Sequence, residues 1–283
     1  MPKRVTIVLI LALLPILSRA QGIRHYEELI DSGFQQEVLS WLADDLCRGR
    51  ECGENGGCEA ARFILGKFHE FEMQPLNWRM VQSFTHDDST VARNVFAMVP
   101  ALVPTDRYLI VSAHYDHIGT IRQTIYNGAD DNASGVTVML SLAKAFSAMR
   151  RDQAGPEKNI IFVAFDGHEK GMCGSKWFAG HLKEIGISPK QIDCVVNFDI
   201  IGTSLEPVGS NPEFIIALGE KSLPKKYHGL IALYATFPSY SMDVDLTFYG
   251  SRNFTEYVYS SGDQSVFRKM GIPAVMFTSG FHK

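Results

Sequence analysis

Short apolar segments typical of buried β-strands alternate along this chain with longer segments of helical periodicity. Strands are expected at residues 93–99, 107–113, 159–165, 193–199, 214–218 and 273–278. An uninterrupted apolar run such as residues 107–113 is typical of a strand that is covered on both faces. Strands that alternate with helices favour a sheet packed between helix layers. The expected fold class is therefore α/β, with a mixed, mainly parallel central sheet between helices.

Helical segments fill the intervals between these strands. The first begins near Ser32, which has the spacing of a capping box with Gln35. A Gly-rich turn at residues 53–57 separates it from a second helix, whose apolar residues recur at helical spacing. Further helices are expected over residues 134–149, 176–185 and 223–234. We find no internal repeat or linker in the sequence, so we expect residues 21–283 to form one domain.

The composition narrows the class of protein. The 283 residues are 46% hydrophobic and 20% charged, which allows a large core and argues against wholesale disorder. Lys and Arg number 27 against 31 Asp and Glu, which gives a net charge of -4. This balance argues against a basic surface that binds nucleic acid. The function of the chain must therefore be sought in its motifs.

Residues 1–20 have the features of a secretory signal peptide. Lys3 and Arg4 provide a positive start, an apolar run follows, and small residues lead up to Ala20, after which cleavage is expected. The apolar run is shorter than the roughly 20 residues that a membrane-spanning helix needs. An uncleaved membrane anchor is the alternative. We expect an exported protein, periplasmic or extracellular, with no transmembrane segment in residues 21–283.

Five cysteines fit an exported protein but leave their pairing open. An odd number cannot pair completely within one chain. Cys47, Cys52 and Cys58 are close in sequence, so two of them are candidates for a disulfide across the loop that they share. Cys173 and Cys194 are expected to be small buried apolar residues.

Residue types that bind metal ions follow the ends of three predicted strands. His114 and Asp116 come after the first of them, Glu169 follows the next, and Asp199 ends the third. Because sites in open α/β sheets gather just beyond the carboxyl ends of the strands, we expect these side chains to lie close together. Histidine combined with several carboxylates suits Zn²⁺ and similar divalent ions.

An acidic turn at residues 128–135 leads into one of the predicted helices. Asp131 and Asn132 are ordinary residues for the start of a helix, and need no metal to explain them. The adjacent carboxylates of Asp130 and Asp131 repel one another, however, unless a cation or hydrogen-bond donors neutralise them. A turn of this kind can supply a carboxylate that bridges two metal ions about 3.5–4 Å apart.

These segments together resemble the M28 family of zinc aminopeptidases and carboxypeptidases. The most telling parts read Ala-His-Tyr-Asp-His at residues 113–117 and Gly-Ala-Asp-Asp-Asn-Ala-Ser-Gly at residues 128–135. The other matching segments are residues 46–64, 165–175, 197–199, 262–267 and 271–274. They occur in order and at suitable spacing over nearly all of residues 21–283. The resemblance implies a fold of the zinc-exopeptidase type and two zinc ions as cofactors.

The resemblance also implies which residues hold the metal. His114 and Asp199 would be terminal ligands of one zinc ion, and Glu169 would be the terminal carboxylate of the second. Asp130 would bridge the two ions. The bond between Asp130 and Asp131 would then be a candidate for a cis peptide bond that does not involve proline.

Two residues would act beside the metal ligands. Asp116 would orient His114 by accepting its second ring N–H. His168 stands where the family usually has the first Glu of a Gly-Glu-Glu segment, the residue that takes a proton from the metal-bound water. Histidine is chemically capable of this general-base role, since its unperturbed pKa is about 6.5. The alternative is a homologue with reduced or lost hydrolysis.

The last metal ligand of the family, a His in a Tyr-His turn, has no counterpart in this sequence. Residues 278–282 match the segment that comes shortly before that turn, and His282 matches an earlier histidine of the segment. We therefore expect the C-terminal end of the domain to be missing. The alternative is that His282 itself serves as the ligand.

The resemblance thus implies a secreted zinc-dependent exopeptidase that acts on peptides. An aminopeptidase, which removes N-terminal residues by means of a metal-activated water, is the expected form. A non-catalytic binding homologue is one alternative. A single-zinc acyltransferase of the glutaminyl-cyclase type is another, although the acidic turn and the residues around His114 speak against it.

Overall fold

The computed structural model describes residues 25–26, 28–87, 89–203, 214–229, 231 and 243–280. The predicted signal peptide of residues 1–20 and the alternative ligand His282 lie outside these residues. Within the described part of the chain, no helix has the length and apolar character needed to cross a lipid bilayer.

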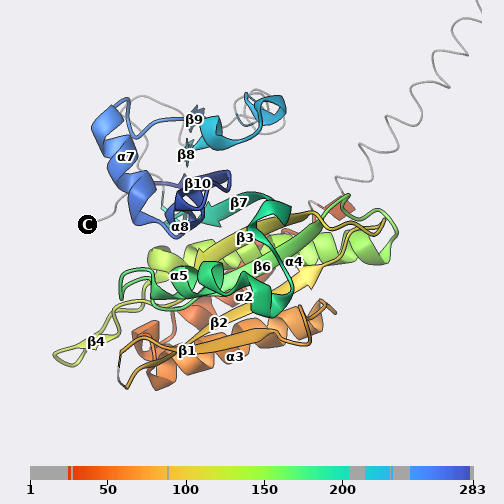
Figure 1. Ribbon diagram of the computed structural model, residues 1–283. Coiled ribbons are helices and arrows are strands. Elements are labelled where there is room, and N and C mark those ends of the chain that lie inside the picture. Colours follow the sequence, from red (N-terminus) through yellow and green to blue (C-terminus); the bar gives the residue numbers. More distant parts are fainter. Residues whose placement is uncertain are drawn as a thin grey trace, which may run out of the picture.

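A mixed sheet of eight strands forms the centre of the described structure (Figure 1). The strands are arranged in the order β1-β2-β6-β3-β7-β10-β8-β9. The four strands β6, β3, β7 and β10 run parallel to one another, whereas β2, β1 and β8 pair in antiparallel fashion. The predicted α/β class, with a mixed and mainly parallel sheet, is therefore confirmed. The strands are β1 (Val81–Thr85), β2 (Val91–Val99), β3 (Tyr108–His114), β6 (Asn159–Phe165), β7 (Ile192–Phe198), β8 (Phe214–Leu218), β9 (Asp243–Asp245) and β10 (Ala274–Thr278).

Helices cover both faces of this sheet. Alternate residues of β6 belong to two different hydrophobic clusters, with Phe162 in one and Val163 in the other, so the strand is buried on both sides. The cluster of Phe162 packs against α2 (Ser32–Leu42), α3 (Asn55–Glu70) and α4 (Gly135–Arg151). The cluster of Val163 packs against α5 (Cys173–Gly180) and α8 (Gln264–Lys269). The arrangement is a sandwich of three layers.

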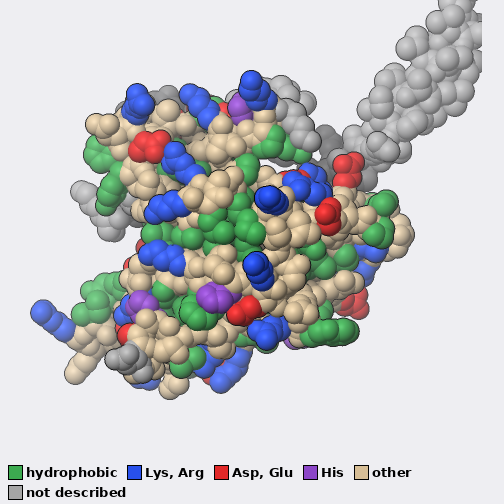
Figure 2. Space-filling view, viewed as in Figure 1, with side chains coloured by type: hydrophobic (Ala, Val, Ile, Leu, Met, Phe, Trp, Pro, Cys, Tyr) green, Lys and Arg blue, Asp and Glu red, His purple; other side chains and the backbone are tan. Residues whose placement is uncertain are grey.

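The two edges of the sheet differ in the elements that lie beside them. In Figure 1, β1 lies at one end, and the blue C-terminal part of the chain lies at the other. Helix α7 (Arg252–Ser261) covers that second end by packing Val258 and Tyr259 against β8 and β10. Figure 2 shows Lys and Arg side chains scattered over the visible face rather than gathered into one basic patch, in keeping with the net charge of -4.

Short helical turns and one small hairpin connect these elements. The hairpin is formed by β4 (Thr120–Ile121) and β5 (Thr124–Ile125). A π-helical turn, η2 (Ala129–Ser134), leads into α4. The 3-10 turns are η1 (Asp45–Arg50), η3 (Leu182–Ile185), η4 (Pro189–Gln191), η5 (Glu220–Ser222) and η6 (Lys225–Tyr227).

Two predicted helix starts were wrong. The first helix is capped by Asp31, whose carboxylate accepts a hydrogen bond of 2.7 Å from the Phe34 amide, and not by Ser32. The second helix begins at Asn55, inside the predicted Gly-rich turn. Glycine is required there because a Cβ on Gly57 would lie 2.6 Å from the carbonyl oxygen of Glu51.

The C-terminal third departs most from the predicted elements. Of the helix predicted at residues 223–234, residues 223–229 contain the short turn η6 and Ile231 is helical, while residues 230 and 232–234 lie outside the described part. The helices α7 and α8 and the strands β1, β4, β5 and β9 were not predicted either. Strand β1 lacks a continuous apolar run because its buried positions include Gln82, which is 4% exposed.

Candidate metal centre

The sheet brings the ends of three parallel strands together. Strand β3 lies between β6 and β7, with His114 paired to Phe165 and Ser112 paired to Asn197. The residues that follow the ends of these strands therefore meet at one edge of the sheet. The sequence predicted this meeting point.

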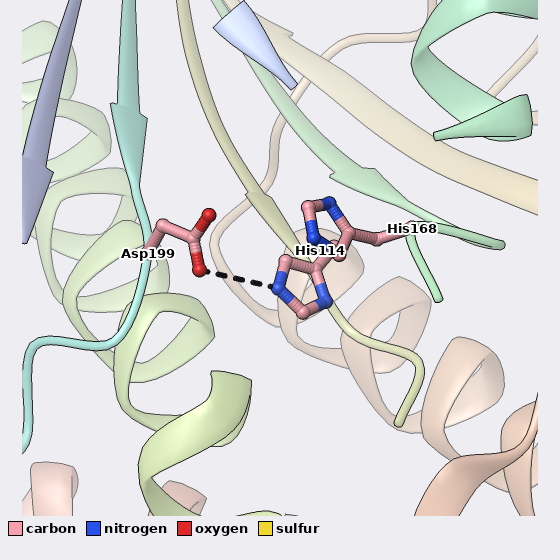
Figure 3. A group of neighbouring side chains, drawn as sticks. All are labelled: His114, His168 and Asp199. Carbon is pink, nitrogen blue, oxygen red and sulfur yellow. Dashed lines mark hydrogen bonds and ion pairs between the residues drawn. The ribbon is translucent and has the colours of Figure 1, made fainter. Parts of the chain in front are cut away.

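One group of ligand-type side chains at this edge consists of two buried residues and one partly buried residue. His114, His168 and Asp199 each offer an atom within 4.8 Å of the others, and we call these residues the inner group. His114 Nε2 lies 3.3 Å from Asp199 Oδ1, and the rings of His114 and His168 stack with their centroids 3.9 Å apart (Figure 3). The structure thus brings the predicted ligands His114 and Asp199 into contact.

A second group of ligand-type side chains lies beside the first. His117, Asp131 and Glu169 also offer atoms within 4.8 Å of one another, and we call them the outer group. His117 Nδ1 lies 3.5 Å from Glu169 Oε1 and 3.9 Å from Asp131 Oδ2. Glu169 was predicted from the sequence, whereas Asp131 and His117 were not assigned as ligands.

Asp131 connects the two groups. Its Oδ1 atom lies 3.4 Å from His114 Nε2 in the inner group, while Oδ2 faces His117 in the outer group. Asp130, which the sequence predicted as the bridging residue, belongs to neither group. Its Oδ1 instead accepts a hydrogen bond of 2.7 Å from the Gly202 amide.

The predicted position of the cis peptide bond was wrong by one residue. The cis bond joins Asp131 to Asn132, rather than Asp130 to Asp131. The prediction failed because two identical carboxylates occur side by side, and the spacing of residues cannot tell which one faces the sheet. The backbone of the turn decides this.

Asn132 holds the acidic turn against the end of β7. This fully buried side chain donates a hydrogen bond of 2.9 Å to the Phe198 carbonyl oxygen and accepts one of 3.1 Å from the Ile200 amide. Gly135 allows this close approach, because a Cβ there would lie 2.6 Å from the carbonyl oxygen of Phe198. The position of Asp131 is therefore fixed by contacts with the strand that leads to Asp199.

Asp116 organises the site in more ways than predicted. The ring of His114 makes its 3.1 Å contact, from Nδ1, with the backbone oxygen of Asp116, and Asp116 Oδ1 lies 3.6 Å away. The carboxylate of Asp116 accepts hydrogen bonds from the amides of His168 and Glu169, at 3.0 and 3.1 Å. One buried carboxylate thus ties β3 to the loop that carries a member of each group.

His168 has a fixed orientation because of a residue far along the chain. Its Nδ1 atom lies 3.0 Å from Oδ2 of Asp263, a side chain that is 0% exposed. The Asp263 carboxylate accepts this hydrogen bond from Nδ1; burial and the neighbouring His114 act to lower the pKa of His168, but Asp263 and Asp199 outweigh them and raise it to about 9. Asp263 lies in a segment that contributed to the family resemblance, but no role was assigned to it.

The contact between His114 and Asp199 favours the charged form of both side chains. Burial alone would lower the pKa of His114, but hydrogen bonds with Asp116 and Asp199 outweigh it and raise that pKa well above its usual value. Burial likewise acts to raise the pKa of Asp199, and the contact with His114 lowers it overall.

The pKa values of the two carboxyl groups in the outer group are shifted in opposite directions. The pKa of Asp131 is raised, first by burial and then by the nearby carboxylates of Asp199 and Glu169. The pKa of Glu169 is lowered, first by its interaction with His117. Three carboxylates thus converge on this edge, and the ion-pair contacts of Asp131, Glu169 and Asp199 in the described residues are with histidines alone.

This donor set fits a divalent cation. Imidazole and carboxylate are the ligands that Zn²⁺ and related ions take in proteins, and each group supplies both. The raised pKa of His114 shows that a positive charge is favoured beside these carboxylates, and a divalent cation bound between them would supply that charge in place of the ring proton. The geometry therefore provides two candidate metal positions that share Asp131.

A buried arginine braces the loops around the centre. Arg50 is 0% exposed, and its guanidinium donates to the carbonyl oxygens of Tyr115, Asn127 and Gly128 at 2.5 to 2.7 Å. Burial lowers its pKa to about 10. Arg50 thus joins the segment after β3 to the turn that carries Asp131.

Comparison with known proteins agrees with this geometry. A profile of peptidase family M28 matches residues 94–283. Aminopeptidase YwaD of Bacillus subtilis (strain 168) is 35% identical over 96 residues, which cover 34% of this chain and 18% of that protein. This chain therefore spans a small part of the length of that relative.

Solved structures share the fold at low sequence identity. LapB from Legionella pneumophila has a TM-score of 0.67 and 19% identity, with 92% of this chain and 64% of that chain covered. Glutaminyl cyclase from Porphyromonas gingivalis has a TM-score of 0.63 and 16% identity, with 87% of this chain and 83% of that chain covered.

The family match takes in more than half of the chain and every residue of the inner and outer groups. This chain belongs to peptidase family M28.

Proposed function

We propose that this protein is a secreted zinc-dependent exopeptidase, and specifically an aminopeptidase that removes N-terminal residues from peptides. The observation that carries the proposal is the pairing of the inner and outer groups through Asp131. Peptide substrates follow from the family, and zinc from relatives that are named as zinc metalloproteases. The proposal of export rests on the signal-peptide features of residues 1–20.

We assign one zinc position to each group. His114 and Asp199 would hold the inner ion, and His117 and Glu169 the outer ion, while Asp131 directs one carboxylate oxygen toward each. Zinc bound there would supply Lewis-acid polarisation of the scissile carbonyl and would lower the pKa of a bound water toward about 7.

His168 would accept the proton of the attacking water. Asp263 binds Nδ1, so Nε2 is the nitrogen that would act as the base, and with the pKa of His168 raised to about 9 it would do so in the fraction of molecules in which the ring is neutral. The amide contacts of Asp116 fix the backbone beneath the ring. Proton transfer needs hydrogen-bond reach before it needs a matched pKa, and this pair of contacts supplies a fixed geometry.

The exposure of the outer group favours the N-terminus of a peptide as the bound end. The side chains of Asp131 and Glu169 are 37% and 26% exposed, whereas Asp199 is 7% exposed. The more exposed outer position leaves room beside it for the α-amino group of a peptide, whereas the buried inner position does not. A substrate held in this way presents its first peptide bond to the inner group.

A single-metal acyltransferase of the glutaminyl-cyclase type is the second candidate. It is favoured by the looser spacing of the outer group, where His117 stands 3.5 and 3.9 Å from its two carboxylate partners. Such an enzyme would use the inner position alone. The connection through Asp131 favours the peptidase over it.

Aminoacyl anilides provide the direct test. The purified, zinc-loaded protein should release the chromophore from a leucyl or alanyl anilide, and should leave the N-acetylated anilide intact. Dialysis against a chelator should abolish the activity and added zinc should restore it. A peptide with N-terminal glutamine is the competing substrate. Cyclisation of that peptide without anilide hydrolysis would replace the peptidase assignment with the acyltransferase.

A further inference from the structure

We propose that Cys52 and Cys173 form a disulfide bond, which covalently anchors the loop that carries His168 and Glu169. The cysteines lie about 120 residues apart in sequence, so the bond closes a loop of the size for which disulfides constrain the unfolded chain most. Both are thiols in the structure, as are the other three cysteines. No step of the proposed hydrolysis uses either residue.

The space beside Gly167 brings the two sulfurs together. A Cβ on Gly167 would lie 3.3 Å from the Sγ atom of Cys52, and the Sγ atom of Cys173 is closer still. Gly167 has a φ of +68°, which favours glycine. The two sulfur atoms come from distant parts of the sequence, and together they occupy the space that a side chain at residue 167 would need.

The pair lies between an apolar cluster and the buried carboxylate of Asp166. Cys52 is 4% exposed and belongs to a cluster with Phe84 and Ala92, against which Cys173 and Trp177 pack. A disulfide has no hydrogen-bond donor to satisfy, so it can be buried beside the apolar cluster without a polar partner. Burial would also protect the bond from reductants.

The other three cysteines have different partners. Cys47 Sγ donates to the Trp41 carbonyl oxygen at 3.3 Å, and Cys58 Sγ accepts from Arg93 Nη1 at 3.2 Å. Cys194 Sγ contacts the carbonyl oxygen of its neighbour Val195 at 3.4 Å. Cys173 Sγ also donates to the Gly167 carbonyl oxygen at 3.3 Å, so the pair is identified by the hydrogen bond between the two thiols and by their shared position beside Gly167. The sequence had left open a bond among Cys47, Cys52 and Cys58, and had predicted Cys173 only as an apolar residue.

The bond would form by exchange with an external disulfide during folding. The pKa of the folded Cys52 thiol is raised, first by its hydrogen bond with Cys173 and then by burial, so it is a poor nucleophile once packed. In the exchange, a thiolate of one cysteine attacks a disulfide-carrying oxidoreductase or a small-molecule disulfide and releases one thiol. The second cysteine then displaces the other thiol, so two protein thiols are oxidised and one external disulfide is reduced.

The bond would secure the loop of the candidate metal centre. The Cys173 amide donates to the Gly167 carbonyl oxygen at 3.0 Å, and the Met172 amide donates to that of His168 at 2.8 Å. Cys173 is therefore the base of a tight turn that starts with His168. Linking this base to Cys52, which follows η1, joins it to the segment that contains Arg50.

Mass spectrometry of the full chain tests the bond without any assay of activity. The protein is refolded in glutathione and glutathione disulfide, alkylated and digested without reduction. The proposal predicts a linked Cys52–Cys173 peptide that separates on reduction, with Cys47, Cys58 and Cys194 alkylated. Alkylation of all five cysteines, or a bond between Cys52 and Cys47 or Cys58, would overturn it.

Thermal unfolding distinguishes the bond from simple packing. Reduction should lower the Tm of the wild type by about 5–15 °C, and that of the control variant Cys58→Ala by the same amount. The double variant Cys52→Ala/Cys173→Ala should start at the lower Tm and show no further drop with reductant. An equal drop in the double variant would show that another bond is responsible.

Discussion

The inner and outer groups of the candidate metal centre are built from the same edge of the sheet but in different ways. His114 is the last residue of β3 and Asp199 follows β7 directly, so the hydrogen-bonded register of two neighbouring strands sets their separation. His117, Asp131 and Glu169 lie on loops and turns. The inner pair is accordingly closer and more buried than the outer contacts.

This difference shows which parts of a site follow from strand order and which depend on loop conformation. The positions of His114 and Asp199 require only that three apolar runs be parallel neighbours. The position of Asp131 requires the conformation of η2, and the brace that Asn132 and Arg50 provide. Substitutions in the two groups should therefore have different consequences.

The largest effect is expected from exchanging the carboxylates of the acidic turn. Asp131→Asn should lower kcat/KM for an aminoacyl anilide by about 10³-fold or more, because it weakens a ligand of both metal positions. The matched variant Asp130→Asn should stay within about tenfold of wild type, since the Asp130 carboxylate accepts a hydrogen bond from the Gly202 amide and belongs to neither group. A larger loss in Asp130→Asn than in Asp131→Asn would reverse our assignment.

Removing one histidine from each group compares them directly. His114→Ala should weaken zinc binding by about 10³-fold, because it leaves Asp199 buried without its partner, whereas His117→Ala should weaken it by about 10–100-fold. Competition with a chromophoric chelator measures both affinities. Equal losses would show that burial does not separate the two groups.

The orientation of His168 can be tested through Asp263. Asp263→Asn should reduce kcat by about 10²-fold with little change in KM, because the neutral amide no longer fixes the ring proton on Nδ1. Zinc content should remain that of wild type. If zinc is lost together with kcat, then Asp263 stabilises the centre as a whole rather than orienting His168.

The hydrogen bonds of Arg50, which hold the loops of the outer group, should contribute measurably to the free energy of unfolding. Arg50→Met should lower the free energy of unfolding by about 3 kcal/mol, because it leaves buried carbonyl oxygens without donors. The control Arg62→Met removes an exposed ion pair with Glu59 and should change it by less than about 0.5 kcal/mol. Urea titration followed by circular dichroism measures both, and similar losses would remove the special role of Arg50.

The sequence predicted the elements that carry continuous apolar runs. The strand predicted at residues 159–165 coincides with β6, which is buried at every position. Strand β1 was missed because Gln82 interrupts its buried face, and α7 because most of its residues face solvent. The hydrophobic pattern of a sequence reflects burial, so it predicts poorly those helices and strands that are only partly buried.

The sequence predicted the site residues that follow strand ends better than those that depend on the conformation of a turn. His114, Glu169 and Asp199 were found from their places after strand ends, and each belongs to one of the two groups. Asp130 was chosen over Asp131 because nothing in a run of two carboxylates reveals the backbone rotation of η2. Asp263 lies almost a hundred residues from His168, and only the packing of α8 against α5 brings its segment near.

Zinc content tests the central claim most directly. The wild type and the Asp130→Asn and Asp131→Asn variants are loaded with zinc, dialysed free of unbound metal and analysed by mass spectrometry of the metal. The account predicts two zinc ions per chain in the wild type and in Asp130→Asn, and one or none in Asp131→Asn. Two ions in Asp131→Asn together with a loss in Asp130→Asn would contradict it.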